Sequence, residues 1–67
     1  MFEVNVKLFS GEIEKTSYPE RHYAKSHAGR KFNQKNTLSA RVSDESGNTV
    51  LQLEKNSAGN CIARVEA

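Results

Sequence analysis

The side chains that could carry chemistry are few: two histidines, one cysteine and eight carboxylates. His22 and His27 lie five positions apart, and Cys61 is far from both along the chain. A zinc site needs three or four such ligands converging tetrahedrally. A cysteine nucleophile needs a base, an orienting group and oxyanion donors in a cleft. The sequence has neither pattern, so we expect no metal, no cofactor and no catalytic centre, and we expect Cys61 to pack in the core.

The cations are concentrated in one segment of a chain whose net charge is only +2. Residues 21–35 contain no acid, whereas the segments on either side are slightly acidic. Such a block can bind phosphates or an acidic protein surface, although it is also typical of a solvated helix face. On an ideal helix its second and fourth cations diverge by about 120°, so one coherent patch requires the chain to leave helical geometry near Gly29. The five cations of this basic block are Arg21, Lys25, Arg30, Lys31 and Lys35.

The length of the chain limits what can lie inside the fold. With 67 residues, of which 36% are hydrophobic, we expect residues 1–67 to form a single domain with a thin core. A substrate pocket of about 300 Å³ or more would remove packing that such a core requires. We therefore expect function to lie on the surface, with no small-molecule substrate.

Cysteine usage and hydropathy predict the compartment. A single cysteine cannot form an intramolecular disulfide, whereas a secreted domain of this size usually depends on several. The N-terminal residues alternate in polarity, unlike a signal peptide, and no run approaches the ~20 apolar residues of a membrane span. We expect a cytoplasmic protein that does not enter a membrane.

The elements that must position these residues follow from hydrophobic periodicity. Phe2 to Leu8 alternates as a strand, and residues 12–16 predict a short second strand with Ile13 facing inward. Ser17 to Glu20 resembles a capping box, which predicts a helix from about Pro19 to Ala28 that reaches Phe32 only if Gly29 is tolerated.

The C-terminal half predicts a three-stranded meander. Residues 37–43, 50–54 and 61–66 alternate in polarity, and turn residues occupy 44–48 and 56–60. The predicted fold class is α+β: a single antiparallel sheet, in the order strand-strand-helix-strand-strand-strand, with one helix packed on one face.

A single helix leaves the other sheet face open to solvent, which gives a second candidate surface. We expect this face to carry Arg41, Arg64 and Glu66, with Val50 and Ile62 as exposed apolar residues among them. The candidate binding residues are therefore the five cations of the basic block together with these two arginines.

The size, the order of the elements and the basic helix with its following loop together resemble some small phage-encoded anti-CRISPR inhibitors. This resemblance implies that Arg30, Lys31 and Lys35 compete for a surface that normally handles nucleic acid. We expect a non-catalytic binding module or inhibitor whose partner is a protein or nucleoprotein complex. Direct nucleic-acid binding through the same cations is the alternative, and a structural role through strand addition at a free sheet edge also stays open.

Overall fold

Alternating valines place the first strand, β1 (Phe2–Leu8), in the interior of the sheet. Val4 and Val6 are buried, Asn5 between them is partly buried, and Glu3 and Lys7 on either side are exposed. The strand pairs antiparallel on one side with β2 (Ile13–Tyr18) and on the other with β3 (Thr37–Ser43). The computed structural model describes all 67 residues.

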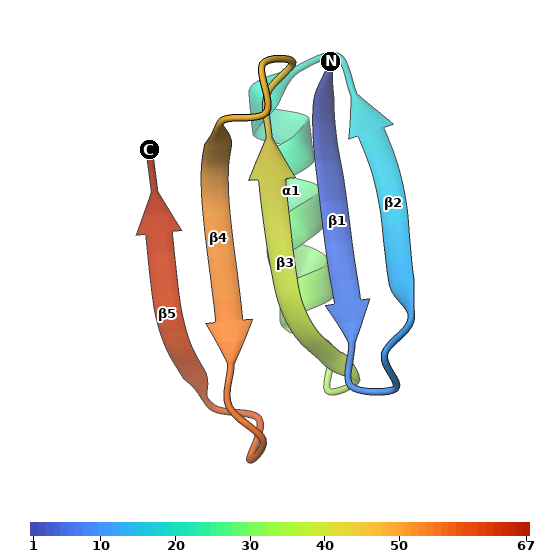
Figure 1. The fold of residues 1–67 in the computed structure, drawn as a ribbon, viewed down its shortest axis with the longest axis vertical. Helices are drawn as coiled ribbons and strands as arrows, with labels where there is room; N and C mark the ends of the chain where they lie inside the picture. Colours follow the sequence, from blue (N-terminus) through green and yellow to red (C-terminus); the bar gives the residue numbers. More distant parts are fainter.

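The remaining elements complete one antiparallel sheet and one helix, which confirms the predicted α+β class. Helix α1 (Arg21–Phe32) follows β2, and β4 (Thr49–Lys55) and β5 (Cys61–Glu66) follow β3. In space the strands run β2-β1-β3-β4-β5, because the connection through α1 returns the chain to the far side of β1 (Figure 1). Strands β2 and β5 are therefore the two edges of the sheet.

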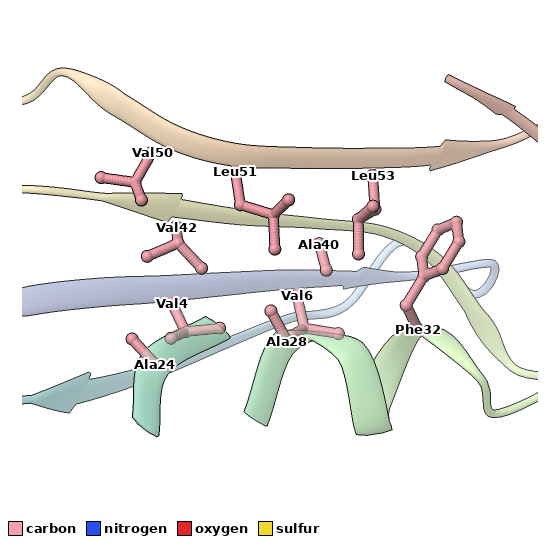
Figure 2. Close-up of a cluster of buried hydrophobic side chains, with 10 residues drawn as sticks. All are labelled: Val4, Val6, Ala24, Ala28, Phe32, Ala40, Val42, Val50, Leu51 and Leu53. Carbon is pink, nitrogen blue, oxygen red and sulfur yellow. The ribbon is translucent and has the colours of Figure 1, made fainter. Parts of the chain in front are cut away.

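The core lies between α1 and the middle of the sheet. The helix contributes Ala24, Ala28 and Phe32, and the closest partners of α1 are β1 and β3 (Figure 2). Alanines in the helix, facing a small residue of β3, let the two layers approach closely. The core residues of the sheet are Val4, Val6, Ala40, Val42, Val50, Leu51 and Leu53.

Three bulges shift the register of the sheet, one in each strand of the meander. The extra residues are Leu38, Val50 and Ile62, each the second residue of its strand. They are spaced twelve positions apart along the chain. A bulge sets two residues against one on the neighbouring strand. Thus Val50 and Leu51 both oppose Val42, and both are buried.

The two turns of the meander repeat one hydrogen-bond pattern. In the first, the Asp44 carboxylate accepts from the backbone N–H groups of Ser46 and Asn48. In the second, the Asn56 side-chain oxygen accepts from the equivalent groups two and four residues on. Gly47 and Gly59 each have a φ of +85°, which favours glycine.

The structure overturns several predicted side-chain directions, and the bulges account for those in the meander. Val50 is 4% exposed and belongs to the core, not to the open face. Leu38 opposes Lys7, so that Thr37 is the buried residue at the start of β3. Ile13 also opposes Lys7 across the sheet and is 60% exposed, so its predicted inward position is wrong.

The side chains of β5 lie on the opposite faces of the sheet from those predicted. Arg64 and Glu66 oppose Leu53 and Leu51, which places them on the helix side of the sheet and not on the open face. Cys61 is exposed, because β5 lies beyond the part of the sheet that α1 covers. The predictions that Cys61 packs in the core and that Arg64 shares a face with Arg41 are therefore both wrong.

The start and end of the helix also differ from the capping-box prediction. Ser17 belongs to β2 and pairs with Glu3, and the N-cap is Glu20, with no hydrogen bond from its side chain. The helix continues through Gly29 because Phe32 must reach the core one turn later. A methyl group added at Gly29 would meet no atom within 4 Å.

The substitution Gly29→Ala should stabilise the protein. Alanine in a helix interior is favoured over glycine by about 0.5–1 kcal/mol, and nothing here obstructs its side chain. The melting temperature should therefore rise by roughly 2–8 °C for a domain of this size. The matched control Gly59→Ala should lower stability by about 1–2 kcal/mol, because its positive φ disfavours a side chain. If Gly29→Ala lowers the melting temperature as the control does, the helix ends where the sequence pattern placed its end.

Candidate anion-binding site

The continuous helix divides the basic block between its two flanks. Lys25 forms an ion pair and hydrogen bond with Glu66 of β5. Lys31 lies on the opposite flank and forms an ion pair with Glu14 of β2, with 3.3 Å between its Nζ and the carboxylate. Since the chain does not leave helical geometry at Gly29, the basic block does not form the single patch that binding through all five cations requires.

These flanking cations fasten the helix to both edges of the sheet. Arg21 donates a 2.7 Å hydrogen bond to the carbonyl oxygen of Ala67, just beyond β5. The hydrogen bond from Lys25 lowers the pKa of Glu66 below its ordinary value. Partly exposed pairs of this kind stabilise a fold only weakly, because water screens the charges. Arg21, Lys25 and Lys31 thus have partners within the fold, which leaves them less available to bind another molecule.

Two cations of the block form neither a side-chain hydrogen bond nor an ion pair, and both lie at the C-terminal end of the helix. Arg30 is in the last turn of α1, and Lys35 is in the loop that follows. Both are exposed, and neither forms an ion pair. Their charges are therefore directed at solvent, where a partner can reach them.

An open hollow of about 530 Å³ lies beside this end of the helix. Its wall joins the end of α1 and the following loop to the turn between β4 and β5. Two lysines contribute positive charge, an asparagine contributes an amide, and no carboxylate lines the hollow. The lining residues are Phe32, Asn33, Lys35, Lys55, Ala58, Gly59 and Cys61.

Lys55 is held in place at this hollow. Its Nζ donates a 2.9 Å hydrogen bond to the carbonyl oxygen of Gln34 and lies 4.8 Å from the centre of the Phe32 ring. The ammonium group has three donors, and Gln34 uses one of them. The ring attracts the charge without neutralising it. Lys55 therefore presents a positioned cation with two further donors, suited to a carboxylate or a phosphate.

Sequence reasoning missed Lys55, although a signal was present. Leu51, Leu53 and Lys55 alternate on one face of β4, and the first two are buried in the core. Continuing that face by one step places Lys55 against the end of the helix. Its charge lies outside the basic block in the sequence, and only the fold brings it to the same hollow as Lys35.

The two arginines of the second candidate surface do not lie on the same side of the sheet. Arg41 lies on the open face and donates a 3.0 Å hydrogen bond from Nε to Thr49 Oγ1. Arg64 lies on the opposite side of the sheet, 3.8 Å from Glu66. The two arginines therefore cannot contact one partner surface together across the open face.

The histidines do not converge with any third ligand. The structure brings together no three His, Cys, Asp or Glu side chains that could hold a metal ion. His22 packs against Tyr23, with 4.1 Å between the ring centres. His27 is half-buried, and its Nδ1 lies 2.9 Å from the Tyr18 hydroxyl of β2. This contact is a second link between α1 and β2, after the ion pair of Lys31 with Glu14.

The environment of His27 favours its neutral form. Burial lowers the pKa of its imidazole, and the charges of Lys31 and Arg30 lower it further, against a smaller opposing effect of Glu14. The unfolded chain takes up this proton near the ordinary pKa of 6.5, whereas the folded chain takes it up at lower pH. The unfolded state then binds more protons between the two pKa values.

Stability should therefore fall as the pH is lowered from about 6.5 through the pKa of folded His27. Urea unfolding at a series of pH values from about 7.5 to about 5 would measure this, because most carboxylates titrate below that range. The variant His27→Gln should show a flatter dependence in the same window. An unchanged slope in His27→Gln would mean that another group is responsible.

Comparisons with known proteins assign no function to the hollow. The chain matches no protein-family model, no curated protein and no solved structure. No helix is long and apolar enough to cross a membrane. The chemistry of the hollow therefore follows from its own residues: two ammonium groups and an amide without an acid, at the end of the helix where Arg30 is also unpaired.

Proposed function

We propose that this protein is a non-catalytic, cytoplasmic binding module that docks onto an acidic surface of a protein or nucleoprotein partner. The docking surface consists of Arg30, Lys35 and Lys55, which we call the helix-end cations. The observation that supports this most is the hollow, where Lys35 and Lys55 meet without any carboxylate. Complementary charge of this kind accelerates and orients association between proteins.

The shape of the site favours a protein partner over a free nucleic acid. A concave site can accept a protruding acidic side chain, with Ala58 and Gly59 forming its far wall. Single-stranded nucleic acids are usually bound on exposed aromatic rings, but Phe32 is only 8% exposed and Lys55 lies over it. The site therefore offers charge without a stacking platform.

A module of this kind acts on its partner by covering part of the partner's surface. Inhibition is one form that this function would take, in the manner of the small phage-encoded anti-CRISPR proteins. The cations that fasten the helix, Lys25 and Lys31, are then structural and not part of the contact.

A pair of charge-matched variants tests the docking surface. The first variant combines Arg30→Glu, Lys35→Glu and Lys55→Gln. The second makes the same change in charge among the unpaired cations of β1, β2 and β3. It combines Lys7→Glu, Lys15→Glu and Arg41→Gln.

Both variants should stay folded, since exposed substitutions usually change stability by no more than about 0.5 kcal/mol each. Lys55 is half-buried, and Lys55→Gln removes one hydrogen bond, at a cost of about 0.5–1.5 kcal/mol. Wild type and both variants would be used to capture partners from the native host, followed by calorimetry with the captured partner. We expect the helix-end variant to bind at least about tenfold more weakly, a loss of about 1.4 kcal/mol, and the control to bind like wild type. A control that fails while the helix-end variant binds would place the contact on the open face.

Salt dependence separates the two kinds of partner. Direct binding to duplex DNA through several phosphates weakens by orders of magnitude between about 50 and 200 mM salt. We expect fluorescence anisotropy to show no binding of labelled duplex or single-stranded DNA and RNA at physiological salt. Tight, steeply salt-dependent binding that the helix-end variant loses would establish direct nucleic-acid recognition instead.

A further inference from the structure

Strand β5 is an edge whose outer hydrogen-bonding groups have no partner. The backbone N–H of Ala67 donates to the carbonyl oxygen of Val50, which fixes the alternation along the β4–β5 ladder. The backbone groups of Ala63, Val65 and Ala67 therefore face β4, whereas those of Arg64 and Glu66 face away from the sheet. Figure 1 shows α1 lying behind β1 and β3, with β5 clear of it.

The side chains of β5 do not protect this edge as fully as those of the opposite edge. Ile62 and Val65 are each 61% exposed. The turn and strand at the β2 edge carry Glu12, Glu14 and Lys15, and such charges discourage pairing with another strand. Strand β5 has two charged residues, Arg64 and Glu66, of opposite sign and two positions apart. That spacing makes the strand complementary to itself.

We propose that β5 pairs antiparallel with β5 of a second copy of this chain, across a two-fold axis at Val65. The two sheets then form one continuous sheet, with the same surface used by both copies. The occupant is a second copy because two antiparallel copies of β5 are complementary: each Arg64 lies opposite a Glu66, and Val65 lies opposite Val65. This interaction is independent of the helix-end cations.

Charge selects this register among the neighbouring ones. With the axis at Val65, Arg64 lies opposite Glu66 of the second copy, and the same pair forms again on the other side of the axis. An axis at Arg64 would place two arginines directly opposite each other, which is unfavourable. An axis at Ala63 would place Arg64 opposite Ile62 of the second copy and would form no directly opposed ion pair.

The charges of β5 are available for this exchange. Within one chain Arg64 lies 3.8 Å from Glu66, which is a loose contact between exposed side chains. Lys25 holds Glu66 on its helix side. Arg64 of the second copy would then complete a group of three charges around each Glu66. Two cations around one carboxylate, partly shielded from water, form a stronger arrangement than an isolated exposed pair.

The open face of the seam is apolar. Ala63 and Val65 oppose Glu54 and Gln52 of β4, so they lie on the side of the sheet that α1 does not cover. In the proposed register Val65 contacts Val65 of the second copy, and Ala63 lies opposite Ala67. Pairing therefore matches charges on one side of the seam and buries exposed apolar groups on the other.

A disulfide across the axis tests the pairing and its register. At a pair without direct hydrogen bonds, opposite Cα atoms lie about 4.5 Å apart, within the range that a disulfide spans. The variant Cys61→Ser/Val65→Cys should become a linked dimer under mild oxidation at micromolar protein. In the control Cys61→Ser/Ala63→Cys, the two sulfur-bearing residues are staggered by roughly 13 Å, so the control should stay monomeric. Equal linkage of both variants, or none of the first with its fold intact by circular dichroism, would overturn the proposal.

Complementary charge reversals test the ion pairs without any covalent link. Arg64→Glu alone and Glu66→Arg alone each place like charges across the axis, so sedimentation should show at least about a tenfold weaker self-association for each. An equimolar mixture of the two variants restores opposite charges at both positions, and we expect it to form a mixed dimer. A mixture that stays monomeric where wild type dimerises, or wild type that stays monomeric at millimolar concentration, would contradict the pairing. The helix-end variant should dimerise like wild type, so failure of the docking surface and failure of the edge pairing can be told apart.

Discussion

One helix must cover the core of a five-stranded sheet, and the rest of the structure depends on that constraint. A helix is about 10–12 Å across, while strands are spaced by about 4.8 Å, so α1 can shield little more than two strands. It packs on β1 and β3, where Val4, Val6, Ala40 and Val42 form the centre of the core. The bulge at Val50 adds a third buried residue from β4, beside Leu51 and Leu53. The edges of the sheet lie beyond this cover.

The uncovered edges explain how the cations are used. Lys25 and Lys31 extend from opposite flanks of the helix to acids on the two edge strands, and Arg21 reaches the end of the chain. These contacts hold a helix whose buried face is narrow and rich in alanine. Arg30 in the last turn of the helix and Lys35 in the loop after it form no ion pair with either edge strand. The proposed docking surface is therefore what remains of the basic block after the fold has used the other cations.

Hydrophobic periodicity was sufficient for the buried face of β1 and for the bounds of β3. The alternation of β1 predicted its buried valines, and residues 37–43 form β3 as expected. The bulges had no comparable signal, because no residue type at Leu38, Val50 or Ile62 marks them, and each one changes the face of its neighbours. Arg64 was for this reason assigned to the wrong side. Gly29 suggested a helix end, but burial of Phe32 outweighs the roughly 1 kcal/mol that glycine costs in a helix.

The candidate site could be predicted only in part for the same reason. Arg30 and Lys35 were found from local charge, whereas Lys55 enters the hollow through the register of β4. The central claim is that the helix-end cations, and not the flanking ones, are free to bind acidic groups. An NMR titration of the ¹⁵N-labelled protein with a short Glu-rich peptide tests it most directly. We predict saturable shift changes at Asn33, Lys35, Lys55 and Gly59, with little change at Arg21 and Lys25. Changes centred on Arg21 and Lys25, or spread evenly over all cations, would contradict the account.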